Sequence, residues 1–171
     1  MCHSLVGSEM CIRDSHITML SVKLIAVLFI MNSTVLAEEK SRFLLKDTNI
    51  SVVEAGKKVY GTYCAACHGK NLEGQPNWET FGADGRLPAP PHDESGHTWH
   101  HPDSYLVDVV LNGFTPGKNK PLEYESNMPA FKNILDVDQI ISALSYIKST
   151  WSIDYREWQE NATRNDMSTG Q

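Results

Sequence analysis

The sequence is poor in cysteine and has no excess of positive charge. Only four cysteines occur in 171 residues, and two of them, Cys2 and Cys11, precede residue 37. The formal net charge is −6 at pH 7, which argues against binding to nucleic acid or to an anionic membrane surface. No βαβ pattern is visible, so a thioredoxin-like fold is not expected. The apolar stretch at 24–31 is too short to cross a bilayer easily.

The N-terminal region divides into two parts. Residues 1–18 show no periodicity, and we interpret them as a non-native leader without a structural role. Residues 19–37 have the layout of a secretory signal peptide, with Lys23, the apolar stretch 24–31 and the cleavage pattern Val35-Leu36-Ala37. The alternative is an uncleaved N-terminal anchor, and membrane association is expected only in that case. Cleavage leaves two cysteines in the chain and a net charge that is still −6.

The most informative stretch is Cys64-Ala65-Ala66-Cys67-His68. Two thiols separated by two residues and followed by a histidine are the signature of c-type haem attachment. Each thiol can form a thioether with one haem vinyl group, and the histidine then lies under the iron as its proximal ligand. A redox dithiol or half of a zinc site would use the same spacing. A zinc site also needs a second ligand pair, and the remaining cysteines lie far upstream.

The residues around this motif predict helices joined by long loops. Ser51 and Glu54 match a capping box, and Gly56 inside the helix that follows indicates a close helix crossing near Tyr60. A second capping box is formed by Asp136 and Gln139. The predicted segments are an irregular arm at 38–50, helices at 52–63, 102–111 and 137–150, a polar helical extension at 155–165 within the C-terminal extension 151–171, and a frayed end at 166–171.

The loop at 69–102 contains a rigid run, Leu87-Pro88-Ala89-Pro90-Pro91. A metal-bound histidine usually donates its second ring N–H to a carbonyl group. We expect His68 to donate to the carbonyl of Pro90, with Pro88 as the second choice. A plain polyproline turn is the alternative at each position.

A second axial ligand is expected from Met128, in Asn127-Met128-Pro129-Ala130-Phe131. A thioether is a soft ligand that suits haem iron opposite a histidine. The alternative is a core methionine, because most methionines pack in cores. The other methionines are poorer candidates, since they lie in the first 37 residues or in the polar C-terminal tail.

Together these features resemble class I cytochrome c in its small bacterial single-haem form. The resemblance covers about residues 51–150 and includes the haem motif, Met128 and the last helix around Ala143-Leu144-Ser145-Tyr146-Ile147. It implies an all-α fold in which the N- and C-terminal helices cross around one haem, covalently bound through Cys64 and Cys67. No structural disulfide is then expected. Alanine at 143, the long histidine-rich loop and the tail beyond 150 depart from the family pattern.

The resemblance also implies a function. It implies iron held by His68 and Met128, and a periplasmic electron carrier that acts on redox partner proteins. No enzyme activity, no small-molecule substrate and no nucleic acid partner are expected, and the chain should be a monomer. Two alternatives stay open: a haem subunit of a dehydrogenase or oxidase, and a haem-based sensor.

Four histidines crowd into the loop, and their role is open. We expect them to line the haem edge. A second metal such as copper or zinc is the alternative, although the ligand spacing is irregular. A histidine from this loop is also an alternative to Met128 as the second axial ligand. The four are His92, His97, His100 and His101.

Overall fold

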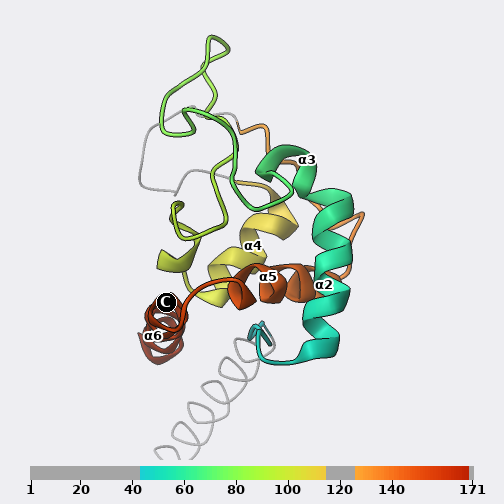
Figure 1. Ribbon diagram of the computed structural model, residues 1–171, viewed down its shortest axis with the longest axis vertical. Helices are drawn as coiled ribbons and strands as arrows, with labels where there is room; N and C mark the ends of the chain where they lie inside the picture. The colour runs from blue at the N-terminus through green and yellow to red at the C-terminus, as the bar shows by residue number, and fades with distance from the viewer. Residues whose placement is uncertain (1–42, 115–125, 170–171) are drawn as a thin grey trace, which may run out of the picture. The chain divides into compact units, whose positions relative to one another are not determined.

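The computed structural model describes residues 43–114 and 126–169, and within these ranges every regular element is a helix. This confirms the all-α prediction. None of these helices is long and apolar enough to span a membrane. The predicted leader and signal segments lie outside the described residues. The helices are α2 (Ile50–Tyr63), α3 (Ala65–His68), the 3₁₀ helix η1 (Thr98–His100), α4 (Asp103–Asn112), α5 (Val137–Ser149) and α6 (Ile153–Thr169) (Figure 1).

Helix α2 begins two residues earlier than the sequence suggested. Its N-cap is Asn49, whose side-chain oxygen accepts a hydrogen bond from the backbone N–H of Val52 at 3.3 Å. Ser51 lies inside the helix and donates its hydroxyl to the same oxygen at 2.8 Å. The predicted capping box of Ser51 and Glu54 is therefore wrong. Asn49 has the extended backbone that an N-cap requires, whereas Ser51 is already helical.

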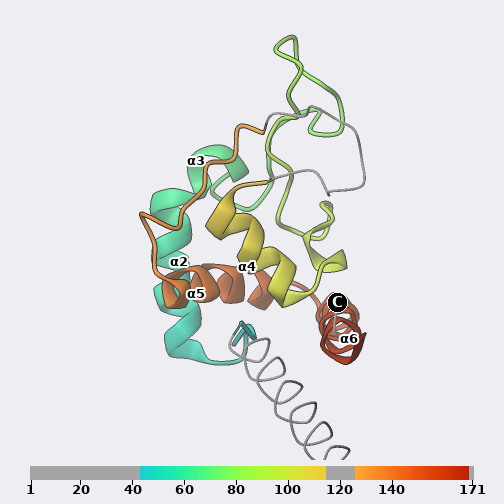
Figure 2. The ribbon, with the colours of Figure 1, turned by 180° about the vertical axis from the view of Figure 1, so that it is seen from behind.

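The crossing of α2 and α5 is the largest helix–helix contact among the described residues, and Figure 2 shows the two helices crossing. A Cβ atom added to Gly56 would overlap the backbone carbonyl of Ser142 and lie 3.0 Å from the backbone nitrogen of Ala143. One turn later, the rings of Tyr60 and Tyr146 pack with centroids 5.5 Å apart. The predicted crossing at Gly56 and Tyr60 is confirmed. Alanine at 143 suits it, because a larger side chain beside so close an approach would separate the helices.

Helix α5 supplies most of the core. Its capping box is formed as predicted: Asp136 accepts from the N–H of Gln139, and the Gln139 side chain accepts from the N–H of Asp136. The helix ends at Ser149, one residue before the prediction. Its buried apolar side chains face both α2 and α4 and include Ile140, Ile141, Leu144 and Ile147.

Helix α4 begins at Asp103 with Pro102 as its N-cap, and ends at Asn112. The prediction was 102–111, so the two agree within a residue at each end. Gly113 follows with a φ of 78°, a conformation that glycine adopts without strain. This glycine turns the chain out of the helix, as the sequence predicted.

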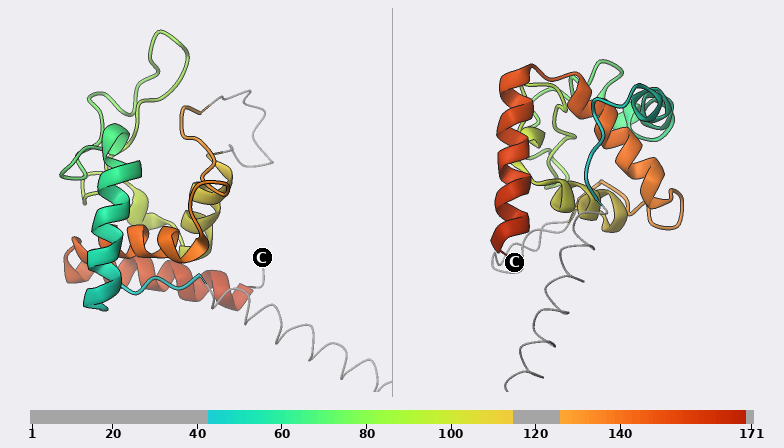
Figure 3. Two further views of the ribbon diagram at one scale, coloured as in Figure 1. Left: turned by 90° about the vertical axis from the view of Figure 1, so that its right-hand side faces the viewer. Right: turned by 90° about the horizontal axis from the view of Figure 1, so that it is seen from below.

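Helix α6 is longer than expected. It begins at Ile153 and continues to Thr169, so the prediction of a frayed end is wrong for residues 166–169, while 170–171 lie outside the described residues. It packs against η1 (Figure 3). Its stability comes from buried polar contacts, described next, rather than from an apolar stripe that a sequence pattern would reveal.

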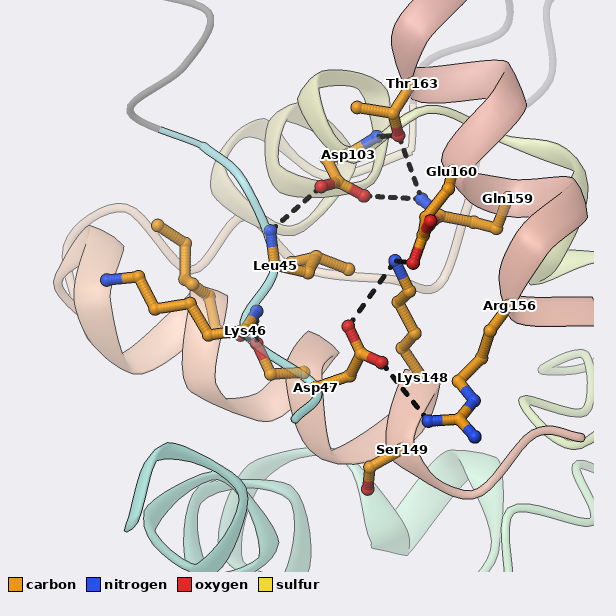
Figure 4. A network of polar contacts seen from close by, with 12 residues as sticks. Leu45, Lys46, Asp47, Asp103, Lys148, Ser149, Arg156, Gln159, Glu160 and Thr163 are labelled. Atoms are coloured by element: carbon orange, nitrogen blue, oxygen red, sulfur yellow. Dashed lines mark hydrogen bonds and ion pairs between the residues drawn. The ribbon is translucent and has the colours of Figure 1, made fainter. Parts of the chain in front are cut away.

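A polar network joins α6, α4, α5 and the irregular arm before α2 (Figure 4). The carboxylate of Asp103 accepts hydrogen bonds from the N–H of Leu45, at 2.8 Å, and from the side-chain amide of Gln159. Asp103 and Gln159 are 3% and 0% exposed, and the Gln159 amide also donates to the His101 carbonyl and the Thr163 hydroxyl, each at 3.2 Å, so both carboxylate oxygens and the amide nitrogen have protein partners. Nearby, Asp47 lies 3.5 Å from Lys148 and 3.6 Å from Arg156. The arm is thus held between α5 and α6.

Candidate functional site

The two cysteines of the motif lie at the junction of α2 and α3, with Cys64 between the two helices and Cys67 inside α3. Cys64 is the C-cap of α2. Its N–H donates to the carbonyl of Tyr60 at 2.9 Å, and its own carbonyl accepts from the N–H of Cys67 at 3.1 Å and of His68 at 2.9 Å. Both thiols are free; Cys64 is half-buried and Cys67 is exposed. Burial, and secondly the nearby Cys67, raises the pKa of Cys64 to about 11. Both sulfurs are thus close together and unpaired, and that of Cys64 is protonated at neutral pH.

His68 ends α3 and is buried. Its Nδ1 lies 2.8 Å from the carbonyl oxygen of Pro90. Burial lowers the pKa of this imidazole, and the Pro90 carbonyl opposes part of that shift. A neutral ring that donates Nδ1–H to Pro90 leaves the Nε2 lone pair for a metal. The contact joins the two residues that the sequence had paired; their role toward haem stays a prediction.

The Pro90 carbonyl is fixed by the turn that follows the motif. Gly74 has a φ of 69°, and a Cβ there would lie 2.5 Å from the nitrogen of Pro91. Its N–H donates to the carbonyl of His68 at 2.8 Å, and the next N–H, of Gln75, donates to Ala89 at 2.9 Å. The proline run and the histidine therefore meet because glycine permits both the turn and the close approach.

Met128 lies on a segment that returns past the end of α4. The N–H of Phe131 donates to the carbonyl of Val110 at 3.0 Å. The ring of Phe131 packs edge-on against Tyr63, the residue before Cys64, with centroids 6.4 Å apart. Met128 itself is half-buried against the core. The segment thus approaches the cysteine motif, while ligation by Met128 stays a prediction.

His92 makes contacts that the sequence did not reveal. Its ring stacks on His68, with centroids 4.0 Å and planes 23° apart. Its Nδ1 lies 2.9 Å from the hydroxyl of Thr98, and its carbonyl accepts from the indole N–H of Trp151 at 2.8 Å. Burial, followed by the neighbouring imidazoles, holds the pKa of His92 well below its usual value. The position of His92, two residues after Pro90, was the one sequence signal for this contact. A segment whose Pro90 carbonyl bonds His68 also brings His92 close to the His68 ring.

The other three loop histidines contact aromatic rings. His97 stacks on Trp78, with centroids 5.4 Å apart, and His101 stacks on Tyr105 at 4.5 Å. His100 lies 3.7 Å from Trp99, centroid to centroid. Within 43–114 and 126–169, no group of three or more His, Cys, Asp or Glu side chains is arranged to hold a metal ion. The copper or zinc alternative therefore finds no support there, and haem lining stays a prediction.

The donor set fits covalent haem. Two free thiols lie three residues apart, the spacing that places side chains on one helix face. The imidazole beside them is neutral, and its tautomer is set by a backbone carbonyl. The all-helical fold and this site define a c-type haem protein.

Comparison with known families agrees. The Cytochrome c family model matches residues 53–151, more than half of the chain, and the protein belongs to the cytochrome c family. Membership implies covalently attached haem c and haem-based electron transfer, and proteins of this family generally act as electron carriers rather than catalysts. Neither curated proteins nor solved structures gave a match.

Proposed function

We propose that the protein is an exported electron carrier with a single haem c, of the small bacterial class I type. The observation that supports this most directly is the contact between His68 Nδ1 and the Pro90 carbonyl at 2.8 Å. It fixes the ring and its tautomer beside two free thiols. A dithiol site has no need of an imidazole held in this way, and a zinc site would need a group of ligands that the described residues do not bring together.

The proposed ligand set is His68 and Met128, with thioethers to Cys64 and Cys67. Bound haem c supplies a one-electron couple between ferric and ferrous iron in which no bond is made or broken. In this proposal His68 and Met128 would both bind the iron, so that no coordination position would be left for a substrate. The neutral thioether of Met128 favours the ferrous state and raises the reduction potential. This supports a carrier without enzyme activity or a small-molecule substrate.

Location and partners follow from the N-terminal segment and the charge. The signal peptide at 19–37 supports export to the periplasm, and membrane association would require that segment to be retained. The net charge of −6 supports redox proteins, rather than nucleic acid, as partners. The carrier is proposed to act as a monomer with transient docking.

Replacement of the two cysteines tests attachment. Cys64→Ala and Cys67→Ala together should abolish haem that survives denaturing electrophoresis, because no thioether can form. Mass spectrometry of the exported wild-type chain should give the cleaved mass plus one haem. Haem staining of the double variant after denaturation would refute the attachment site, and a mass without haem would refute the function.

Replacement of Met128 tests the distal ligand. Met128→Ala should keep haem attached, open the sixth position to carbon monoxide and lower the reduction potential. Met167→Ala is the matched control, because this methionine is 37% exposed on α6 and far along the chain. An unchanged potential in Met128→Ala would show that another residue, such as a loop histidine, is the ligand. Carbon monoxide binding to the ferrous wild type at neutral pH would instead favour a sensor.

A second candidate is a haem subunit of a periplasmic or membrane oxidoreductase. It is favoured by α6, an ordered extension that continues beyond the family match at residue 151. Size-exclusion chromatography and co-purification from the native host distinguish the two. A stable complex with a dehydrogenase or oxidase would favour the subunit, and a monomeric haem protein would favour the carrier.

A further inference from the structure

Four aromatic side chains form a patch where α6 packs on η1. We call Trp99, His100, Tyr155 and Trp158 the aromatic patch. Trp99 is its centre: its ring contacts Tyr155 edge-on, with centroids 4.6 Å apart, and Trp158 perpendicularly at 5.9 Å. Trp158 is 59% exposed, and His100 is also exposed. An indole so exposed on an otherwise polar helix is unusual for a free surface and typical of protein interfaces.

Packed contacts join this patch to the proximal histidine. Trp99 follows Thr98, which is 6% exposed and whose hydroxyl lies 2.9 Å from His92 Nδ1. His92 in turn stacks on His68 with centroids 4.0 Å apart. The connection from His68 to the surface therefore consists of one ring stack, one hydrogen bond and the backbone between two adjacent residues.

The charge around Trp158 is negative. Asp154, Glu157, Trp158 and Asn161 are all exposed and recur at helical spacing, so they share one face of α6. The two nearby cations lie against other carboxylates. The Arg156 guanidinium lies 3.6 Å from Asp47, and that of Arg164, which donates to Asn161 at 2.6 Å, lies 3.9 Å from Glu160. No ion pair to Asp154 or Glu157 occurs among the described residues. A partner with positive charge on its docking surface complements this face.

We propose that the aromatic patch, with Asp154 and Glu157 beside it, is the docking surface for a redox protein with a basic face, and that electrons pass between this surface and His68 through Trp99, Thr98 and His92. The proposal rests on the proposed carrier function. It adds a route for electrons on the α6 side of the molecule. Direct transfer through the edge of the bound haem would be the alternative route.

Electron transfer from a small cation tests the charge. Hexaammineruthenium(II) gives one electron to the ferric holoprotein and becomes ruthenium(III), so electrons balance and no bond changes. The rate constant for Asp154→Asn/Glu157→Gln should fall about threefold to tenfold at about 0.1 M ionic strength, where screening acts over about 10 Å. Glu54→Gln/Asp138→Asn removes the same charge from exposed sites on α2 and α5, and its rate constant should fall clearly less.

Replacement of the exposed indole tests the aromatic contact. Trp158→Leu should lower the same rate constant about twofold to fivefold, because a cation over an exposed indole gains a modest attraction. Ile50→Ala is the control, since Ile50 is 80% exposed at the start of α2. Haem content and reduction potential should match the wild type in all of these variants.

A binding measurement provides a readout that does not depend on electron transfer. Hexaamminechromium(III) is a paramagnetic, redox-inert cation, and it should broaden the Trp158 indole N–H signal in NMR spectra of the ferrous protein. Broadening around Cys67 with none at Trp158, or equal rates for the patch and control variants, would overturn the docking proposal and favour the haem edge. Absence of a reversible one-electron haem couple in the wild type would instead refute the carrier function.

Discussion

The close crossing of α2 and α5 makes a sharp prediction about two glycines on the same helix. A methyl group on Gly56 would overlap the carbonyl oxygen of Ser142, whereas a methyl group on Gly61 meets no atom within 4 Å. Both substitutions to alanine gain helix propensity, worth about 1 kcal/mol. Only Gly56→Ala also has to separate two packed helices, which costs about 1–3 kcal/mol or more.

Because the gain in helix propensity is common to both variants, their free energies of unfolding should differ by the separation cost alone, about 1–3 kcal/mol or more, with Gly61→Ala at or above the wild type. For a domain of this size, that corresponds to roughly 4–12 °C in unfolding temperature. Thermal and urea unfolding of the holoprotein, followed by circular dichroism, measures the difference. The haem spectrum checks that each variant carries its cofactor.

A third variant separates backbone from side-chain clashes. The atom that Gly56→Ala would overlap is a backbone oxygen, so Ser142→Ala should not restore the stability of Gly56→Ala. Equal stability of Gly56→Ala and Gly61→Ala would refute the reasoning about the crossing. Rescue by Ser142→Ala would show that the side chain at 142, and not the helix backbone, limits the approach.

Two further predictions concern the network and the pH dependence. Asp103→Ala leaves the Leu45 N–H without its acceptor and removes one of three acceptors of the Gln159 amide, and urea unfolding should show a loss of about 1–3 kcal/mol; Asp108→Ala, at an exposed carboxylate of the same helix, should lose little. Burial, then neighbouring imidazoles, lowers the pKa of His97 and of His101, while Glu79 opposes the shift at His97. Below about pH 6.5 the unfolded rings bind protons that the folded rings do not, so stability falls as pH decreases, and above it both states are neutral. Urea titrations of wild type and His97→Asn/His101→Asn should show a smaller acid loss in the variant; equal losses would contradict this.

Local sequence signals predicted the parts of the fold that depend on local physics. The capping box of Asp136 and Gln139 needs only residues three apart, and it is present. Gly56 predicted a close crossing because glycine inside a helix is costly without a packing reason. At α2 the same logic failed, since Asn49 and Ser51 are both good caps and only the backbone conformation decides between them.

The rest of the site depends on contacts between residues far apart in the chain. Gln159 bonds Asp103 across 56 positions, and the Trp151 indole bonds His92 across 59. Neither pair leaves a periodic pattern, because each joins one polar atom to another across elements that must first be placed. The stacking of His92 on His68 is similar: composition revealed a histidine-rich loop, but only the turn at Gly74 determines which ring lies on the proximal one.

Two described segments flank the family match, the arm at 43–49 and helix α6, and both are bonded to the matched region at the same place. The match covers 53–151, and both flanking segments contact the same two buried residues of the matched region. Asp103 bonds Leu45 on one side and Gln159 on the other, and Lys148 lies near Asp47 and, at 3.7 Å, Glu160. Burying a carboxylate and an ammonium with only one partner each would be costly. The arm supplies one partner to Asp103 and one to Lys148, and α6 supplies the second partner to each. Because α6 also carries Trp158, the contacts that secure the arm hold the proposed docking face in a fixed position.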